Sequence, residues 1–333
     1  MSGFLRPSHG RKEEAGPPSL SQLSRICHGK PLADTIGRST SIILIEAVTK
    51  LGSETTANKA DWREHLTVAP DVSDPSSGPL YRNLLGPSQW PDPAVLPKFR
   101  PAIQGLMDRS TKLTKDMRQL IAEAIGVDIN MFESLFKENQ QDKLRLIRYP
   151  EPPAVADNSE IQSLGAHQDT SFSTLIYQLS EHRCLQALDP RGEWINCPPI
   201  PGSIIYVLGQ GFNAYTWGFC KACWHRVIPP PPGSGDRHSM AMPSYIGQDV
   251  SLKDPKTQEA LEYTKEEISK RHPNHKAIVP QYMLEESKYD SAGQRVFSSY
   301  VKSFPEVTRR WVRSLLSVVR KALFDVLLTM TLM

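Results

Sequence analysis

The segment between residues 144 and 243 restricts the possible fold more than any other part of the sequence. Proline is confined to turns, strand ends and sheet edges, and twelve of the chain's 28 prolines lie between Pro150 and Pro243. Short β-branched or aromatic runs separate the proline clusters, at residues 144–149, 173–178, 193–197, 203–208 and 226–228. Short strands divided by turns are typical of an all-β sandwich or barrel, and the lack of helical periods between them argues against a parallel βαβ sheet.

Helical patterns flank this β-rich segment. Apolar residues between Ile103 and Ala124 recur at spacings of three, four and seven, which predicts one long amphipathic helix ended by Gly126. Helical spacing returns over residues 255–272 and 305–328. The predicted fold class is therefore mainly β with flanking helices.

Charge and cysteine content narrow the partners and the compartment. The 333 residues include 39 Lys and Arg against 36 Asp and Glu, and this near balance argues against nucleic acid as a partner. The N-terminus has no apolar run typical of a secretory signal, and the apolar C-terminal tail is interrupted by charges, so we expect a cytoplasmic protein with no membrane partner. The cysteines are odd in number, which favours reduced thiols over a disulfide framework: Cys27, Cys184, Cys197, Cys220 and Cys223.

A histidine and an aspartate two residues apart are the first candidates for chemistry. His167 and Asp169 adjoin the predicted strand at 173–178, and side chains two apart on an extended chain face the same side. His225, on another predicted strand, supplies a third ligand. Two histidines and one carboxylate form the facial triad of non-haem Fe(II) oxygenases, which leaves positions open for co-substrate and dioxygen.

A second motif follows twelve residues later. Arg237 and Ser239 face the same side of a strand, and the arginine fork can hold a carboxylate bidentately. With triad and clamp in this order, the chain resembles the isopenicillin N synthase-like 2-oxoglutarate- and Fe(II)-dependent oxygenase superfamily. Further segments carry the resemblance, which spans roughly residues 60–312: 145–150, 192–195 and 198–202.

The resemblance implies a double-stranded β-helix (jelly roll) with Fe(II) held by the triad. It also implies that 2-oxoglutarate is a co-substrate held by Arg237 and Ser239, often helped by the tyrosine that matches Tyr149. The implied activity is oxidation of an unactivated C–H bond by hydroxylation, desaturation or ring rearrangement, with no catalytic residue beyond the metal centre. We expect a small-molecule substrate and dioxygen as partners, a role in natural-product biosynthesis, and a monomer.

The resemblance divides the chain into four parts. These are an atypical N-terminal segment that is disordered or truncated (1–60), a helical part (61–142), the oxygenase jelly-roll core (143–250), and a C-terminal helical region with an atypical tail (251–333).

The chain departs from the family pattern at two positions near the motifs. Ser171 stands where the family commonly has glycine, and Ile147 stands where it often has asparagine. We also expect an apolar wall for the organic substrate, since such sites are mostly apolar. The residues expected in that wall are Met240, Met242, Phe172, Phe212 and Tyr215.

Two alternatives stay open. One is an iron oxidase of the same fold that does not use 2-oxoglutarate, in which Arg237 and Ser239 hold a carboxylate of the substrate. The other is a non-catalytic remnant that binds a ligand or partner, suggested by the unusual residues 1–60.

Overall fold

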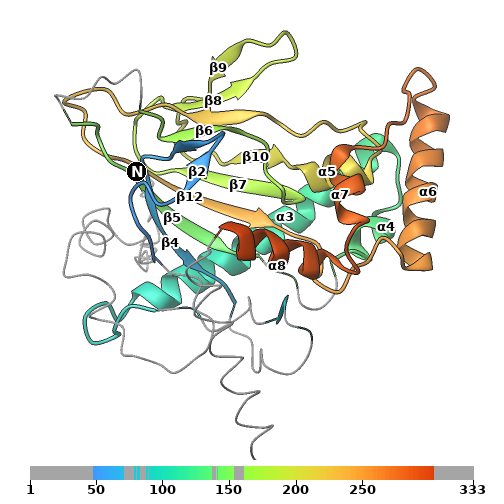
Figure 1. Ribbon diagram of the computed structural model, residues 1–333, viewed down its shortest axis with the longest axis horizontal. Coiled ribbons are helices and arrows are strands. Elements are labelled where there is room, and N and C mark those ends of the chain that lie inside the picture. The colour runs from blue at the N-terminus through green and yellow to red at the C-terminus, as the bar shows by residue number, and fades with distance from the viewer. Residues whose placement is uncertain are drawn as a thin grey trace, which may run out of the picture.

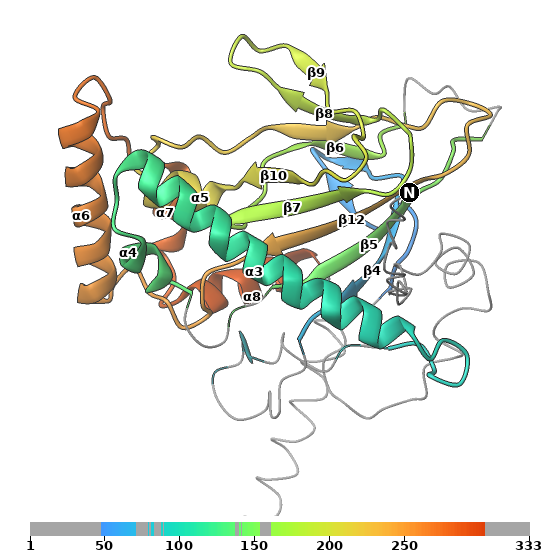
Figure 2. The same cartoon turned by 180° about the vertical axis from the view of Figure 1, so that it is seen from behind.

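The structure, a computed structural model, describes residues 48–70, 79, 81–82, 88, 90–136, 140, 142–153 and 161–303. The expected helix at 305–328, Cys27 and residues 1–47 lie outside them and are not tested. Within the described part, two antiparallel sheets face each other, and helices cover the larger sheet and one end of both sheets (Figures 1 and 2). The prediction of a mainly β fold with flanking helices is confirmed.

The larger sheet has six strands, each antiparallel to its neighbours. In order across the sheet they are β1 (Val48–Thr49), β4 (Glu64–Val68), β5 (Leu144–Tyr149), β12 (Arg237–Ser244), β7 (Ser173–Gln178) and β10 (Ile205–Leu208). Strands β5 and β7 coincide with the predicted runs. Strands β1 and β4 were not predicted, because β1 has only two residues and three of the five residues of β4 (Glu64, His65 and Thr67) are polar.

The smaller sheet has four strands and carries part of the candidate site. Its order is β6 (Leu164–His167), β11 (His225–Val227), β8 (Leu185–Leu188) and β9 (Trp194–Asn196). A separate pair, β2 (Thr55–Thr56) and β3 (Lys59–Ala60), lies against β6. Buried Asp61 joins the two, because its carboxylate accepts hydrogen bonds from Thr56 Oγ1 at 2.7 Å and from the backbone N–H of Gly165 at 3.2 Å.

The predicted long helix is α3 (Phe99–Ile125), which runs across the outer face of the larger sheet (Figure 2). It ends at Gly126, whose φ of 76° is the left-handed conformation that glycine adopts at low cost. Met240 and Met242 of β12 are buried against this helix layer, whereas Arg237, Ser239 and Ala241 face the space between the sheets. The alternation along β12 therefore separates the core from the candidate site.

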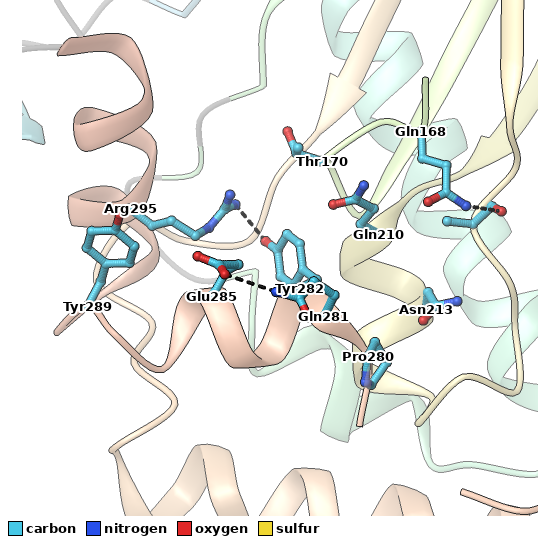
Figure 3. A pocket seen from close by; sticks show the side chains of 11 residues that line it. Gln168, Thr170, Gln210, Asn213, Pro280, Gln281, Tyr282, Glu285, Tyr289 and Arg295 are labelled. Atoms are coloured by element: carbon cyan, nitrogen blue, oxygen red, sulfur yellow. Dashed lines mark hydrogen bonds between the residues drawn. The ribbon is translucent and has the colours of Figure 1, made fainter. Parts of the chain in front are cut away.

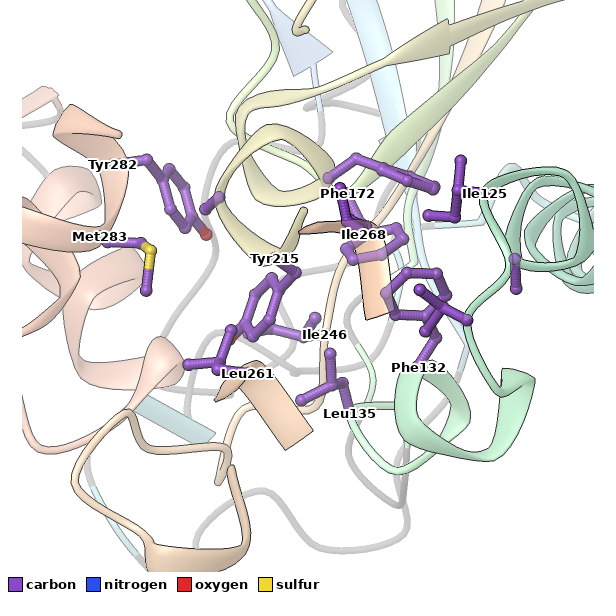
Figure 4. Close-up of a cluster of buried hydrophobic side chains, with 14 of the residues drawn as sticks. Ile125, Phe132, Leu135, Phe172, Tyr215, Ile246, Leu261, Ile268, Tyr282 and Met283 are labelled. Carbon is purple, nitrogen blue, oxygen red and sulfur yellow. The ribbon is translucent and has the colours of Figure 1, made fainter. Parts of the chain in front are cut away.

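The other helices gather at one end of the sheets (Figure 1). They are α4 (Ile129–Glu133), α5 (Gln210–Tyr215), α6 (Pro255–Arg271), α7 (Gln281–Glu286) and α8 (Ala292–Ser303). Figure 4 shows the apolar cluster between them, in which Phe172, Tyr215 and Leu261 are buried. Among the described residues, no helix is both long and apolar enough to cross a membrane.

Candidate metal and co-substrate site

The structure brings the three predicted metal ligands together at the junction of β6 and β11. His167 ends β6 and lies directly across from His225, the first residue of β11. Asp169 follows two residues after His167, and the ligand atoms of all three side chains lie within 4.8 Å of one another. His167 Nε2 is 3.5 Å and His225 Nε2 is 4.0 Å from Asp169 Oδ1.

Both imidazole rings are oriented as metal ligands require. The Nδ1 of His167 lies 2.9 Å from the carbonyl oxygen of Gly165, and the Nδ1 of His225 lies 3.2 Å from that of Cys223. A proton on each Nδ1 donates to that carbonyl and leaves the Nε2 lone pair directed at the shared point. Burial lowers the pKa of His225, with Asp169 opposing the shift, so the neutral ligand form is favoured. This donor set fits Fe(II).

The carboxylate of Asp169 accepts a hydrogen bond from one hydroxyl side chain, which is itself hydrogen-bonded to a second. Thr174 Oγ1 donates to Asp169 Oδ2 at 2.6 Å, and Ser171 Oγ lies 3.0 Å from Thr174 Oγ1. Burial alone would raise the pKa of Asp169, but its bonds to His167 and Thr174 and the nearby His225 ring hold that pKa well below its usual range. Ser171, where the family commonly has glycine, extends the hydrogen-bonded chain that ends on the metal ligand.

The loop that carries Asp169 is fixed by the start of α5. The backbone N–H groups of Gly209, Gln210 and Gly211 donate to the carbonyl oxygens of Phe172, Asp169 and Ser171, at 3.0, 2.8 and 3.0 Å. A Cβ atom on Gly209 would lie 2.1 Å from the carbonyl oxygen of Ser171. Only glycine permits this close approach, and no pattern in the sequence signals it.

The predicted carboxylate clamp lies on β12, on the same inner face. Arg237 is 1% exposed, and among the described residues its hydrogen-bond partners are neutral and distant: Ser239 Oγ at 3.4 Å and Gln178 Oε1 at 3.5 Å. Its guanidinium lies 4.8 Å from the ring centre of Tyr149, its partner across the sheet. A buried guanidinium with neutral partners of this kind favours an anionic ligand, because an isolated buried charge is costly.

Triad and clamp line one cavity of about 230 Å³ between the two sheets. His167, Asp169 and His225 come mainly from the smaller sheet, and Arg237, Ser239 and Tyr149 come from the larger one. We call this space the inner cavity. A molecule with a carboxylate at Arg237 and a chelating group at the triad would span it.

The prediction of an apolar wall that lines the site is wrong. Phe172, Phe212 and Tyr215 are buried in the cluster between the helices, and Met240 and Met242 pack toward α3; none of the five lines the inner cavity. Strand alternation explains the methionines, because inward Ser239 and Ala241 require Met240 and Met242 to point outward.

Known proteins with similar sequences identify the family. Residues 141–244 match the model of the 2OG-Fe(II) oxygenase superfamily. The 2-oxoglutarate-dependent dioxygenase frbJ of Dothideomycetidae sp. (strain 11243) is 34% identical over 263 residues, covering 79% of this chain and 70% of the relative. The chain belongs to the 2OG-Fe(II) oxygenase superfamily. It is accordingly an iron-dependent oxygenase that uses 2-oxoglutarate as co-substrate and acts on a small molecule.

Two further comparisons place this oxygenase among its relatives. A homoarginine-6-hydroxylase, 2-ODD-C23, of Glycine max is 29% identical over 182 residues, covering 54% of each chain. The crystal structure of a full-length Neurospora crassa protein in complex with alpha-KG superposes with a TM-score of 0.56 at 21% identity, covering 75% of this chain and 80% of that one. The latter likeness concerns the fold, and it confirms the predicted jelly-roll core.

Proposed function

We propose that His167, Asp169 and His225 hold Fe(II) and that Arg237 and Ser239, with Tyr149, hold the far carboxylate of 2-oxoglutarate. The single observation that carries this proposal is the inner cavity, in which a converging His/Asp/His set and a buried guanidinium lie on opposing sheets. When bound, iron and 2-oxoglutarate supply the oxidising chemistry that breaks an unactivated C–H bond.

The residues of the chain provide position and exclusion of water. Arg237 and Ser239 fix one end of 2-oxoglutarate, and the ring of Tyr149 supports the guanidinium. Thr174, which is hydrogen-bonded to Ser171, fixes the Asp169 carboxylate, and the start of α5 fixes its backbone. Rigid placement of the reacting groups is the protein's contribution to such a reaction.

The two alternative hypotheses are less well supported. An iron oxidase without 2-oxoglutarate would use Arg237 for a carboxylate of its substrate, and the family favours 2-oxoglutarate at that position. The non-catalytic remnant was suggested by residues 1–60. Residues 48–68, however, supply β1 and β4 to the larger sheet, and Thr56 and Arg63 line the inner cavity.

We extend the proposal to the physiological setting. The enzyme would act as a cytoplasmic monomer on a small molecule in natural-product biosynthesis, without nucleic-acid or membrane partners, as the charge balance and reduced cysteines suggest. The Glycine max relative is named for hydroxylation of homoarginine, so amino acids are the first substrate class to test.

Turnover in the presence of oxygen tests the proposal. Purified protein with Fe(II) and 2-oxoglutarate should form succinate, and Asp169→Ala should not. Oxygen consumption that is independent of 2-oxoglutarate would support the oxidase instead. Succinate formation by Asp169→Ala at the parental rate would rule out the assigned triad.

A further inference from the structure

A second cavity adjoins the loop after β6 that carries Asp169, on the side of the helices. We call this loop, residues 168–172, the metal loop. The cavity has a volume of about 380 Å³ and lies between the metal loop and helices α5, α7 and α8 (Figure 3). Two of its lining residues, Gln168 and Thr170, also line the inner cavity, and they flank Asp169 in the sequence. We call it the helix-side cavity. Its size is within the range of small-molecule sites, ~300–1,000 Å³.

The two cavities would hold different molecules. Under the proposed function, iron and 2-oxoglutarate occupy the inner cavity between the triad and Arg237. The organic substrate must then approach the metal from another side, and the helix-side cavity reaches the metal loop at Gln168 and Thr170. Its residues on α7 and α8 lie outside residues 141–244, the part that matches the family. Contacts specific to this enzyme's substrate are expected in such a region.

The lining of the helix-side cavity is polar. Every lining residue except Ala222 and Pro280 has a polar side chain, and four of them are carboxamides. Carboxamides both donate and accept hydrogen bonds. Gln168 and Gln281 already donate to the carbonyl oxygen of Ala222 and to Glu285, at 2.8 and 3.0 Å, so Gln210 and Asn213 are the carboxamides that a polar ligand would pair with. Figure 3 shows Gln168, Gln210 and Asn213 on one side of the cavity and Arg295 and Glu285 on the other.

The two charged residues of the cavity have opposite sign. Arg295 of α8 is oriented by neighbours, since its Nη2 donates to Tyr282 Oη at 2.7 Å and its Nε lies 3.4 Å from Glu286 Oε2. Glu285 of α7 is 47% exposed and accepts hydrogen bonds from Gln281 and Lys288, at 3.0 and 2.7 Å. A guanidinium fork suits a carboxylate, and a carboxylate suits an ammonium group.

We propose that the helix-side cavity binds the organic substrate as a zwitterion of the amino-acid class. Its carboxylate faces Arg295, its ammonium group faces Glu285, and the C–H bond to be oxidised extends toward the metal past Gln168 and Thr170. This inference rests on the proposed function, because it assumes that 2-oxoglutarate occupies the inner cavity.

Binding without turnover tests the inference. Protein loaded with Zn(II) and 2-oxoglutarate is titrated calorimetrically with the common L-α-amino acids, and the tightest binder is then compared with its methyl ester and its Nα-acetyl derivative. Each derivative should bind at least tenfold more weakly, as expected for the loss of one charge-assisted contact, about 1.5–3 kcal/mol. Equal binding of the free acid, the ester and the acetylated form would overturn the inference.

Two variants with the same chemical change sharpen the test. Glu285→Gln should weaken the free amino acid about tenfold and leave the Nα-acetyl derivative unaffected. Glu259→Gln, at an exposed position of α6, should change neither and serves as the control. If Glu285→Gln binds the free acid as the parent does, the ammonium assignment fails.

The Fe(II)–2-oxoglutarate absorption band distinguishes failure of the amino-acid site from failure of the proposed iron and 2-oxoglutarate site. If that band forms while every amino acid fails to bind, the inference fails and the proposed function stands. If the band does not form, both fail together.

Discussion

The inner cavity and the helix-side cavity share a loop but are built differently. The inner cavity is enclosed by strands, and its functional side chains occupy alternating positions such as Arg237 and Ser239 on β12. The helix-side cavity is enclosed by α5 and by the neighbouring helices α7 and α8, which follow α5 only after a long stretch of sequence. Most residues of the inner cavity lie within the family match, whereas the side of the helix-side cavity formed by α7 and α8 lies outside it.

This difference suggests a division of labour. Strand pairing and backbone hydrogen bonds fix the inner cavity, so its chemistry depends on a few rigid groups. Side chains on short helices form the helix-side cavity, so its recognition can change without moving the metal. Variants in the two cavities should therefore change different measured quantities.

Replacing the clamp arginine should have the largest effect among these variants. Arg237→Met removes two charge-assisted hydrogen bonds to 2-oxoglutarate, which should raise the KM for 2-oxoglutarate more than about 100-fold. Arg237→Lys should recover part of this loss, because it keeps the charge without the fork. Succinate formation at varied 2-oxoglutarate measures both, with Arg226→Met on β11 as the control. An unchanged KM in Arg237→Met would show that the clamp holds something else.

Replacing Gly209 by alanine should have the second-largest effect, because the added methyl group would displace the loop that carries Asp169. In Gly209→Ala the new methyl group would meet the Ser171 carbonyl at 2.1 Å and displace the loop that carries Asp169. Groups that orient metal ligands commonly contribute about 10–100-fold in affinity, and we expect Fe(II) affinity to fall by that amount. Gly105→Ala on α3 would make only an ordinary contact with Arg109, at 3.5 Å, and should bind iron as the parent does. Equal iron affinity in the two variants would refute the role of α5.

Removing the hydroxyl groups behind Asp169 should have a smaller effect. Thr174→Val deletes the 2.6 Å hydrogen bond to Oδ2 and should lower Fe(II) affinity about tenfold. Ser171→Gly restores the residue common in the family and removes only the more distant hydroxyl, so a loss of about two- to fivefold is expected. Metal titration under anaerobic conditions measures both affinities. A larger loss in Ser171→Gly than in Thr174→Val would contradict the series of hydrogen bonds in which Ser171 reaches Asp169 only through Thr174.

A variant of the helix-side cavity should have the smallest effect, and it should change only the affinity for the organic substrate. Asn213→Ala removes one neutral hydrogen-bonding group, which should weaken the tightest-binding amino acid about two- to tenfold. Its KM for 2-oxoglutarate and its iron affinity should equal those of the parent. A change in iron affinity equal to the change in amino-acid affinity would show that the two cavities are not separable.

The residues that line the inner cavity were easier to predict from the sequence than those around it. The alternation of side chains along a strand involves only residues close together in the sequence. Strands β5 and β7 and the partners on β12 followed from short runs and from side chains two residues apart. The same rule, applied to Met240 and Met242, would have removed them from the expected substrate wall. Strands β1 and β4 were missed, because each depends on a neighbouring strand: β1 pairs with β4, and β4 pairs with β5.

Two features of the site could not be read from the sequence. Gly209 matters because of a carbonyl that lies close in space and 38 residues away (209 − 171). Arg295 and Glu285 line the same cavity as Gln168 and Thr170 only because α7 and α8 pack beside the loop that carries Asp169, which depends on long-range contacts. Such positions are set by tertiary structure, which no local pattern encodes.

The most direct test is the visible charge-transfer band of the Fe(II)–2-oxoglutarate chelate, recorded without oxygen. The parent should show the band, His167→Ala and His225→Ala should lack it, and Arg237→Met should need more than about 100-fold more 2-oxoglutarate to reach it. A band of parental strength in either histidine variant, or no band in the parent, would contradict the assignment of this site.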